Sequence, residues 1–357
     1  MDFSLFYFAA GQATGTDGYR LLLDGARFAD RNGFSAVWTP ERHFHEFGGP
    51  YPNPAVTGAA VAAVTEHVGI RAGSVVGPLH HPLRLAEEWS VVDNLSGGRV
   101  GLSFASGWHA RDFTLRPDAY ADRRRILMET IETVERLWRG DSVRLPDGEH
   151  APVDVRTFPT PLQPRLPVWV TSAGSPETFR QAGRQGYGLL THLLGQELPD
   201  LEKKIAEYRA HLPRENAANP AAGTVTLMLH TFLGTNRETV RETVRGPFTD
   251  YLRSSLGLIM KAAGDILPGV DPEDLDADDR EFLVERSFER YFGTGGLFGT
   301  VEDALPLLER LDAVGVDEVA CLIDFGVGTD EVLAGLEHLG RLRSAWAERQ
   351  RTVRSAR

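Results

Sequence analysis

Eight short apolar runs, rich in β-branched and aromatic residues, recur along the chain and alternate with segments of helical periodicity. They cover residues 5–8, 34–38, 68–76, 100–104, 167–171, 188–191, 224–229 and 318–323. Continuous apolar strands separated by helices are typical of parallel sheets that are covered on both faces. In a chain of 357 residues, eight such units predict a (β/α)8 TIM barrel, in which right-handed crossovers close the sheet on itself.

An open, doubly wound sheet is the alternative arrangement of alternating strands and helices. A sheet of that kind would be expected to carry a glycine fingerprint directly after its first strand. No G-x-G-x-x-G pattern follows residues 5–8, so the sequence favours the closed barrel. We expect residues 1–345 to form one barrel domain, followed by a basic tail at residues 346–357.

Two segments interrupt the alternation. The proline-rich residues 141–165 are predicted to form an excursion on the barrel rim. Residues 246–298, between the seventh and eighth predicted strands, are too many for an ordinary loop. Helical patterns at 250–263 and 278–292, joined by the acidic run 271–281, predict a helical insertion there. The insertion is either a solvated excursion or a lid or partner-docking element over the catalytic face.

Charge and cysteine content exclude several classes of protein. The chain has 38 basic and 50 acidic side chains, a formal net charge of −12, which argues against binding to nucleic-acid phosphates. The single cysteine, Cys321, excludes a disulfide framework and suits a reducing compartment; it is predicted to be inert core within the eighth strand. The N-terminus lacks the pattern of a secretory signal, and no apolar run approaches the roughly 20 residues that span a bilayer. We therefore expect a cytoplasmic protein.

Candidate chemistry gathers on the loops that follow the strands, where the active sites of barrel enzymes lie. Five of the eleven histidines fall on three such loops: His43, His45, His80, His81 and His109. A zinc site built from His43, His45 and His81, with Asp324 as the acidic ligand, is one alternative. The positive charge of Arg42 beside these residues argues against it, so no metal is expected.

The segment after the fifth strand has a different character. Residues 171–178 (TSAGSPET) combine small side chains, a serine N-cap and proline at the first helical position. This pattern gives either an ordinary capped helix or an exposed helix N-terminus, whose N–H groups and dipole attract a phosphate. The run Arg123-Arg124-Arg125 could supply a guanidinium to the same phosphate, or form a solvated basic face.

Taken together, these motifs resemble the bacterial luciferase-like flavin monooxygenases. The resemblance rests on residues 41–48 (ERHFHEFG), 77–88 (GPLHHPLRLAEE), 93–99 (DNLSGGR) and 107–113 (GWHARDF), and extends over residues 1–245 and 300–345. Residues 191–195, 230–232 and 320–326 are similar to the MupA-like subgroup, found within or beside polyketide and nonribosomal peptide assembly lines.

The family resemblance implies a barrel that binds reduced FMN, supplied by a separate reductase, and activates O₂ as a flavin C4a-peroxide. It places small residues near the flavin ring and a turn with an arginine at its phosphate. The ring residues so implied are Ala9, Ala10, Ser74, Ser103 and Ala105. The phosphate residues so implied are Ser172, Ala173, Gly174 and Ser175, with Arg123 or Arg124.

Two departures from luciferase itself affect the predicted chemistry. Arg42 stands where luciferase has its catalytic histidine, and an always-charged guanidinium stabilises an anion but does not act as a base. The acid–base role therefore shifts to His43 or His109. Ala105 replaces the reactive cysteine of luciferase, so no thiol chemistry is expected at the flavin.

The function so predicted is an FMNH₂- and O₂-dependent monooxygenase acting on a natural-product intermediate, free or tethered to a carrier protein. Oxygen would go either to a carbonyl carbon, as in Baeyer–Villiger chemistry, or to an amine or carbon centre. The alternatives are a deazaflavin-dependent hydride-transfer enzyme on the same barrel, a non-catalytic flavoprotein, and a metal hydrolase. The resemblance also implies a homodimer through helices of the first half, and the C-terminal arginines form either a docking patch or a solvated or disordered tail.

Overall fold

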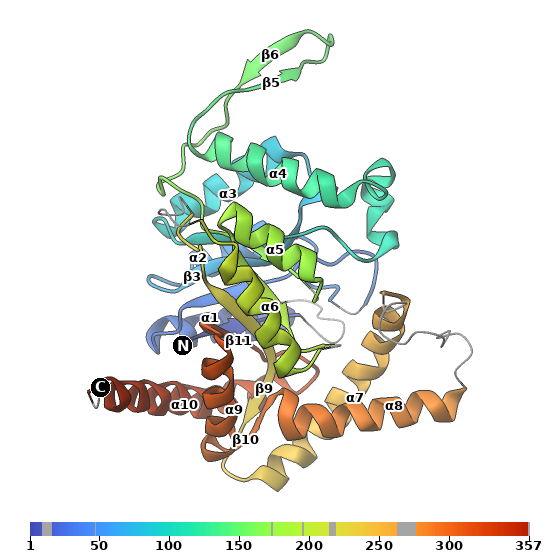
Figure 1. Cartoon of the computed structure of the whole chain (residues 1–357), viewed down its shortest axis with the longest axis vertical. Coiled ribbons are helices and arrows are strands. Elements are labelled where there is room, and N and C mark those ends of the chain that lie inside the picture. Colours follow the sequence, from blue (N-terminus) through green and yellow to red (C-terminus); the bar gives the residue numbers. More distant parts are fainter. Residues whose placement is uncertain are drawn as a thin grey trace.

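The computed structural model describes residues 1–8, 16–46, 48–172, 174–194, 196–213, 219–262 and 276–355, and their parallel strands form a closed barrel (Figure 1). Its strands are β1 (Asp2–Phe6), β2 (Ala36–Thr39), β3 (Gly69–Val76), β4 (Val100–Ala105), β7 (Val168–Thr171), β8 (Gly188–His192), β9 (Val225–Leu233) and β11 (Glu318–Leu322). They follow one another in the order β9-β11-β1-β2-β3-β4-β7-β8, and β8 pairs back with β9. The predicted (β/α)8 barrel is thereby confirmed, and closure rules out the open sheet.

The first strand lies earlier than the sequence pattern predicted. β1 ends at Phe6, whereas the prediction placed a strand at residues 5–8. Beyond Phe6, the backbone N–H of Phe8 donates to the carboxylate of Asp324 (2.5 Å) instead of to a neighbouring strand. The apolar character of residues 7 and 8 therefore belongs to the start of the loop at the carboxyl end of the barrel.

Helices surround the barrel between the strands. They are α1 (Arg20–Arg31), α2 (Pro54–Ala62), α3 (Pro82–Ser96), α4 (Arg123–Trp138), α5 (Pro176–Gln185), α6 (Leu198–Ala210), α7 (Arg237–Ala262), α8 (Ala277–Arg290), α9 (Val301–Val314) and α10 (Thr329–Ser355). Short turns of other helix types are η1 (Thr16–Tyr19), η2 (Gly77–Leu79), η3 (Ala110–Leu115), η4 (Pro117–Ala119) and the π-helix η6 (Tyr291–Gly295). None of the described helices is both long and apolar enough to cross a bilayer.

The excursion at residues 141–165 contains an antiparallel hairpin that the sequence pattern did not predict. β5 (Val143–Pro146) pairs with β6 (Pro152–Val155), and the hairpin projects from the barrel between α4 and β7 (Figure 1). Its base is tied down because Asp93 accepts hydrogen bonds from the backbone N–H groups of Leu162 (2.6 Å) and Gln163 (3.0 Å). A helix-to-strand connection lies at the amino-terminal end of the barrel, so this arm sits on the end opposite the candidate site.

Two helices occupy much of the long stretch between the seventh and eighth barrel strands. α7 begins at Arg237, earlier than the predicted helix, and α8 packs beside it, with Arg245 paired to Glu285 (2.6 Å). Phe248 of α7 is fully buried, with its ring 4.7 Å from that of His230 and 5.3 Å from that of Phe325. α7 is thus anchored on the ends of the barrel strands. A short strand, β10 (Leu297–Gly299), then pairs with the end of β9; residues 271–275 of the acidic run lie outside the described residues.

The C-terminal basic segment is helical as far as Ser355. The predicted domain boundary at 345/346 falls inside α10, which is continuous from Thr329 to Ser355. Trp346 is buried, and Arg349 pairs with Glu309 of α9 (3.0 Å). Because apolar and ionic contacts hold this end against the barrel, the expectation of a disordered tail was wrong for residues 346–355.

Inside the amino-terminal end of the barrel, a half-buried arginine is paired with a buried carboxylate. Arg71 of β3 donates to both carboxylate oxygens of Glu318 (3.0 and 2.7 Å), and its guanidinium lies over the rings of Trp38 (5.0 Å) and Trp169 (4.6 Å). Burial would raise the pKa of Glu318, but the charge of Arg71 and hydrogen bonds from neighbouring donors outweigh burial and lower it. Cys321 is buried in β11 as predicted, and burial raises its pKa to about 12.

Candidate active site

The loop after β2 carries three consecutive polar residues, Glu41, Arg42 and His43, at the carboxyl end of the barrel. The loop folds back on itself, so that the backbone N–H of Arg42 donates to the carbonyl of Tyr51 (2.9 Å). Gly48 adopts a left-handed conformation (φ 80°), and a Cβ there would lie 2.5 Å from Cγ of Arg42. Glycine is therefore required at position 48, both for the backbone conformation and to make room for the arginine side chain.

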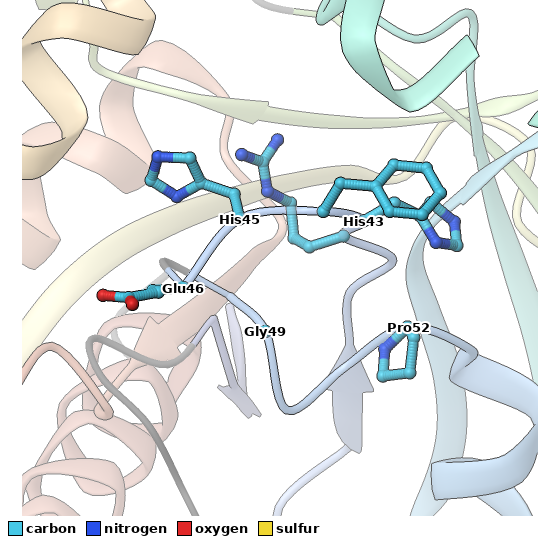
Figure 2. A pocket seen from close by; sticks show the side chains of 7 residues that line it. His43, His45, Glu46, Gly49 and Pro52 are labelled. Atoms are coloured by element: carbon cyan, nitrogen blue, oxygen red, sulfur yellow. The ribbon is translucent and has the colours of Figure 1, made fainter. Parts of the chain in front are cut away.

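A pocket of about 440 Å³ opens on this loop (Figure 2). Figure 2 shows His43 and His45 leaving the loop in opposite directions, with Glu46 on the same side as His45. The residues that line the pocket are Arg42, His43, Phe44, His45, Glu46, Gly49 and Pro52. Two of the three predicted catalytic residues, Arg42 and His43, thus face one cavity.

Glu41 holds two histidines through one carboxylate. Its Oε1 atom is 2.8 Å from Nε2 of His43 and 2.7 Å from Nε2 of His80, while Oε2 accepts from the backbone N–H of Val76 (2.8 Å). Burial would raise the pKa of Glu41, but these hydrogen bonds outweigh burial and lower it. Burial would likewise lower the pKa of His80, but the bond to Glu41 raises it. Glu41 and His80 were not among the predicted site residues, although both lie within the motifs that carried the resemblance.

Arg42 is buried without a hydrogen-bond partner for its guanidinium. The residue is 3% exposed, and its Cζ atom lies over the rings of Trp108 (4.9 Å) and Phe8 (5.8 Å). The nearest carboxylate oxygen is Oδ2 of Asp112, 4.0 Å from the guanidinium and too far for a hydrogen bond. None of its three guanidinium nitrogens has a partner among the described residues. Burial lowers the pKa of Arg42, and Asp112 opposes this shift.

His109, the third predicted catalytic residue, lies on the other side of Asp112. Its Nδ1 atom is 3.5 Å from Oδ1 of Asp112, and its ring packs against Trp108 with 5.6 Å between centroids. Asp112 is buried. One of its carboxylate oxygens faces the guanidinium of Arg42, and the other faces the imidazole of His109. The sequence reasoning missed Asp112, although it lies within the quoted GWHARDF motif.

The predicted ring residues fall on neighbouring strands. The hydroxyl of Ser74 is 2.5 Å from that of Thr171, and the hydroxyl of Ser103 is 2.7 Å from the same Thr171 oxygen. Ala105 ends β4 and is in register with Val76 of β3. Ala9 and Ala10 lie outside the described residues. Three adjacent strands, β3, β4 and β7, thus meet through small hydroxyl side chains, and Thr171 joins the set that the sequence predicted.

The turn before α5 brings in a cation that the sequence did not indicate. Gly174 has a φ of +115°, and its backbone N–H donates to the hydroxyl of Ser172 (3.3 Å). Ser175 is the N-cap of α5, and its side chain makes no capping hydrogen bond. A Cβ on Gly174 would lie 3.2 Å from Nζ of Lys204, on α6. Ala173 lies outside the described residues, so the description of the turn rests on Ser172, Gly174 and Ser175.

The two arginines predicted for the phosphate have other positions. Arg123 donates to the backbone carbonyls of Gly107 (3.2 Å) and Tyr120 (2.8 Å), which fixes it to the loop after β4. Arg124 is exposed on α4. Neither contacts residues 172–175 within the described part of the chain, and their role at a phosphate stays a prediction.

Two further histidines close the opposite side of the barrel mouth. His192 and His230 lie on β8 and β9, and burial lowers their pKa values to about 4 and about 3. Both imidazoles are therefore neutral near pH 7. The zinc alternative finds no support, since the described residues contain no group of three or more metal-ligating side chains.

Known proteins match most of this chain. The luciferase-like monooxygenase family model matches residues 1–320. The oxygenase component of the flavin-dependent trigonelline monooxygenase of Acinetobacter baylyi is 27% identical over 352 residues, which cover 95% of this chain and 93% of that protein.

Solved structures share the fold at low sequence identity. The oxygenating component of 3,6-diketocamphane monooxygenase from Pseudomonas putida, a type II Baeyer–Villiger enzyme in complex with FMN, superposes with a TM-score of 0.71 at 17% identity, covering 95% of this chain and 97% of that one. An F420-dependent secondary alcohol dehydrogenase superposes with a TM-score of 0.66 at 17% identity, covering 94% and 96%. The finer likeness to the MupA-like subgroup stays a prediction. Because the family model spans most of the chain, this protein belongs to the luciferase-like monooxygenase family and is an enzyme.

Proposed function

We propose that this protein is a monooxygenase that uses reduced FMN and O₂. The observation that carries the proposal is the pocket at the carboxyl end of the barrel, lined by Arg42 and His43. Beside it, three strands end in small side chains, and the turn before α5 leads into a helix N-terminus with a lysine next to it. The trigonelline monooxygenase oxygenase component, similar over nearly its whole length, supports a flavin as the cofactor.

The residues present fit an FMN molecule. Small side chains at Ser74, Ser103 and Ala105 leave room for a flat ring system against the strand ends. At the turn, a side chain on Gly174 would crowd Lys204. Helix N-termini and ammonium groups both attract phosphate. We assign the phosphate to residues 172–175 together with Lys204, and the ring to the strand ends.

When bound, reduced FMN supplies the electrons that activate O₂, with one oxygen atom going to substrate and the other to water. The chain's own part is to exclude water and to control charge and protons. Phe8 and Trp108 form an apolar wall beside Arg42, which limits water at the reacting atoms. Arg42 stabilises negative charge in the pocket, since a buried guanidinium acts strongly on a nearby anion.

We assign the proton-holding role to His43 rather than His109. His43 lines the pocket, and its ring is oriented by the hydrogen bond to the buried Glu41. A carboxylate that orients a catalytic imidazole is a recurring arrangement in acid–base catalysis. His109 lies beside Asp112 and packs against Trp108, so we assign it the role of holding Trp108 in the apolar wall.

Partners follow in part from the relatives. The name of the trigonelline enzyme specifies an oxygenase component, which supports a separate reductase for this chain as well. Val56 on α2 and Val91 and Leu95 on α3 are exposed apolar side chains on first-half helices, which supports the predicted homodimer. A natural-product intermediate, and its attachment to a carrier protein, stay predictions.

The test is oxygen transfer under ¹⁸O₂ with FMN, NADH and a flavin reductase. We expect label from O₂ in the product of a panel of carbonyl, amine and thioester substrates, and no product when the reductase or FMN is omitted. The same panel separates insertion next to a carbonyl from transfer to nitrogen or carbon. Turnover without any ¹⁸O in the product would contradict a monooxygenase.

A deazaflavin-dependent hydride transfer is the second candidate, because an F420-dependent dehydrogenase shares this barrel. It predicts tighter binding of the deazaflavin than of FMN and turnover that is indifferent to O₂. Equilibrium titration with both cofactors, followed by assays under argon, distinguishes the two functions.

A further inference from the structure

Arg42 differs from the other buried polar groups of the described chain. Among the described residues, it is the arginine whose three guanidinium nitrogens are all buried and all lack a hydrogen-bond partner; the residue is 3% exposed. Burying a charged group without hydrogen bonds is strongly unfavourable, so native proteins keep such groups for a metal, a ligand or a partner. The unmet donors of Arg42 point to a ligand atom that accepts them.

The surroundings of Arg42 leave its buried donors without an acceptor among the described residues. Trp108 and Phe8 shield the cation from water but offer no lone pair. Asp112 balances part of the charge at 4.0 Å without reaching the nitrogens. Gly48 keeps the space around Cγ open, and Arg42 is one of the residues that line the pocket. A guanidinium held this way presents a fork of parallel N–H groups.

The charges around the pocket limit the kind of ligand. The fork matches the two oxygens of a carboxylate, the ligand group that arginine binds in a bidentate manner. The pocket wall adds the imidazoles of His43 and His45, whereas the exposed Glu46 places one carboxylate at the rim. This balance suits a single negative charge on an otherwise neutral body better than a polyanion.

We propose that Arg42 is the receptor for a carboxylate carried by the substrate, so that the substrate class is a small monocarboxylic acid. The inference rests on the proposed function, since it names the substrate of the same pocket. A volume of about 440 Å³ is within the range of pockets for small organic ligands. The carboxylate bound by Arg42 would hold the substrate in one orientation while the rest of the molecule occupies the pocket.

The experiment measures binding of benzoate, and of uncharged benzamide, to the full-length protein without flavin. We expect saturable benzoate binding, tighter than that of benzamide. Arg42→Met should raise the Kd for benzoate by about tenfold or more and leave benzamide unchanged, because a bidentate charged contact is lost. Arg42→Lys, which keeps the charge but not the fork, should fall in between.

The control is Arg125→Met, which removes an exposed arginine on α4 that pairs with Asp122 and Glu129. Circular dichroism checks that each variant is folded. If Arg42→Met is not folded, Arg42→Lys replaces it in the comparison with the wild type. Absence of saturable benzoate binding to the wild type, or an unchanged benzoate preference in the Arg42 variants, would overturn the proposal.

An FMN titration of the same samples keeps the two ideas apart. The benzoate result alone decides the role of Arg42, and FMN uptake by the wild type alone decides whether the proposed cofactor site exists. If Arg42→Met lowers FMN affinity while the benzoate preference stays unchanged, Arg42 serves the flavin and the carboxylate proposal fails.

Discussion

Two arginines, the half-buried Arg71 and the buried Arg42, lie at opposite ends of the same barrel. Both pack against aromatic rings, Arg71 between Trp38 and Trp169, and Arg42 beside Trp108 and Phe8. Arg71 makes two hydrogen bonds to Glu318, whereas Arg42 makes none and stands 4.0 Å from Asp112. Arginine therefore forms an internal ion pair at one end of the barrel. At the other end its hydrogen-bond donors are unused, and we propose that they bind a ligand.

The location of each arginine agrees with the division of labour in barrels of this kind. Glu318 begins β11, so the Arg71 pair belongs to the amino-terminal end of the barrel, whose residues serve stability. Arg42 follows the end of β2, on the loops that carry function. Substitution of Arg71 should therefore change mainly the free energy of unfolding, whereas substitution of Arg42 should change mainly ligand binding.

The largest expected effect is on the free energy of unfolding of Arg71→Met. Removing one partner of a buried ion pair costs about 3–5 kcal/mol, because Glu318 keeps a buried charge without a counterion. Arg42→Met should change the same free energy by about 1–2 kcal/mol, since no hydrogen bond is lost but the buried Asp112 loses a cation 4.0 Å away. Urea unfolding of both variants measures the difference. Similar losses in both would remove the distinction between the two ends.

The loss in Arg71→Met should also depend on pH. In the wild type the pKa of Glu318 is lowered, so its contribution to stability is present above the ordinary carboxylate pKa of 4.5 and is lost as the pH falls below it. The gap between wild type and Arg71→Met should therefore narrow at acid pH. A constant gap would mean that Arg71 stabilises through packing alone.

The next effect concerns the carboxylate that orients His43. Glu41→Gln should lower the free energy of unfolding by about 1–3 kcal/mol at pH 6, because a buried charged acceptor is lost. The raised pKa of His80 gives stability that is present below pH 6.5 and lost as the pH rises through the higher folded value. The free energy of unfolding of the wild type should therefore exceed that of Glu41→Gln by more at pH 6 than at pH 9.

Urea unfolding at the two pH values checks this expectation. Glu129→Gln is the control, since Glu129 pairs with Arg125 on the exposed face of α4. Its effect should be small and the same at both pH values. An advantage of wild type over Glu41→Gln that grows toward pH 9 would contradict the Glu41–His80 assignment.

A smaller effect is expected at the turn before α5. Lys204→Met should weaken FMN binding by about fivefold, as for a half-exposed charge contact of about 1 kcal/mol, and leave riboflavin binding unchanged. Lys203→Met is the matched control, because Lys203 is the neighbouring residue on α6 and is largely exposed. Fluorescence titration gives the six dissociation constants of FMN and riboflavin for the wild type and the two variants. Equal losses for FMN and riboflavin would place Lys204 away from the phosphate.

The smallest effect belongs to the arm at the amino-terminal end. Phe158→Ser changes an exposed side chain between β6 and β7 and should alter stability by less than about 0.5 kcal/mol. FMN affinity should stay the same, because the helix-to-strand connection lies opposite the pocket. A changed FMN affinity, seen in the same fluorescence titration, would show that the two ends of the barrel are coupled.

Much of the fold was predictable because buried parallel strands produce continuous apolar runs, and each of the eight runs overlaps a barrel strand. The hairpin at residues 143–155 was not, since proline-rich polar segments carry no strand periodicity. The helical C-terminus was not predicted either, because its many arginines indicated a solvated segment, although Trp346 is buried there.

The sequence could predict which residues lie at the carboxyl ends of the strands, as for Arg42 and His43 after β2. Their roles stay predictions. The sequence could not show that Glu41 holds both His43 and His80, since His80 is 39 residues away from Glu41 in the sequence. Lys204 approaches Gly174 only because α6 packs on α5. Nor does any sequence pattern report that a buried guanidinium lacks a partner.

The most direct measurement is an anaerobic titration of the purified protein with reduced FMN, followed by equilibrium dialysis and repeated with oxidised FMN. If the strand ends and the turn before α5 form a flavin site, uptake of reduced FMN saturates at one molecule per chain. Lack of saturable uptake in either redox state would contradict the flavin site and the roles assigned to Arg42 and His43 beside it.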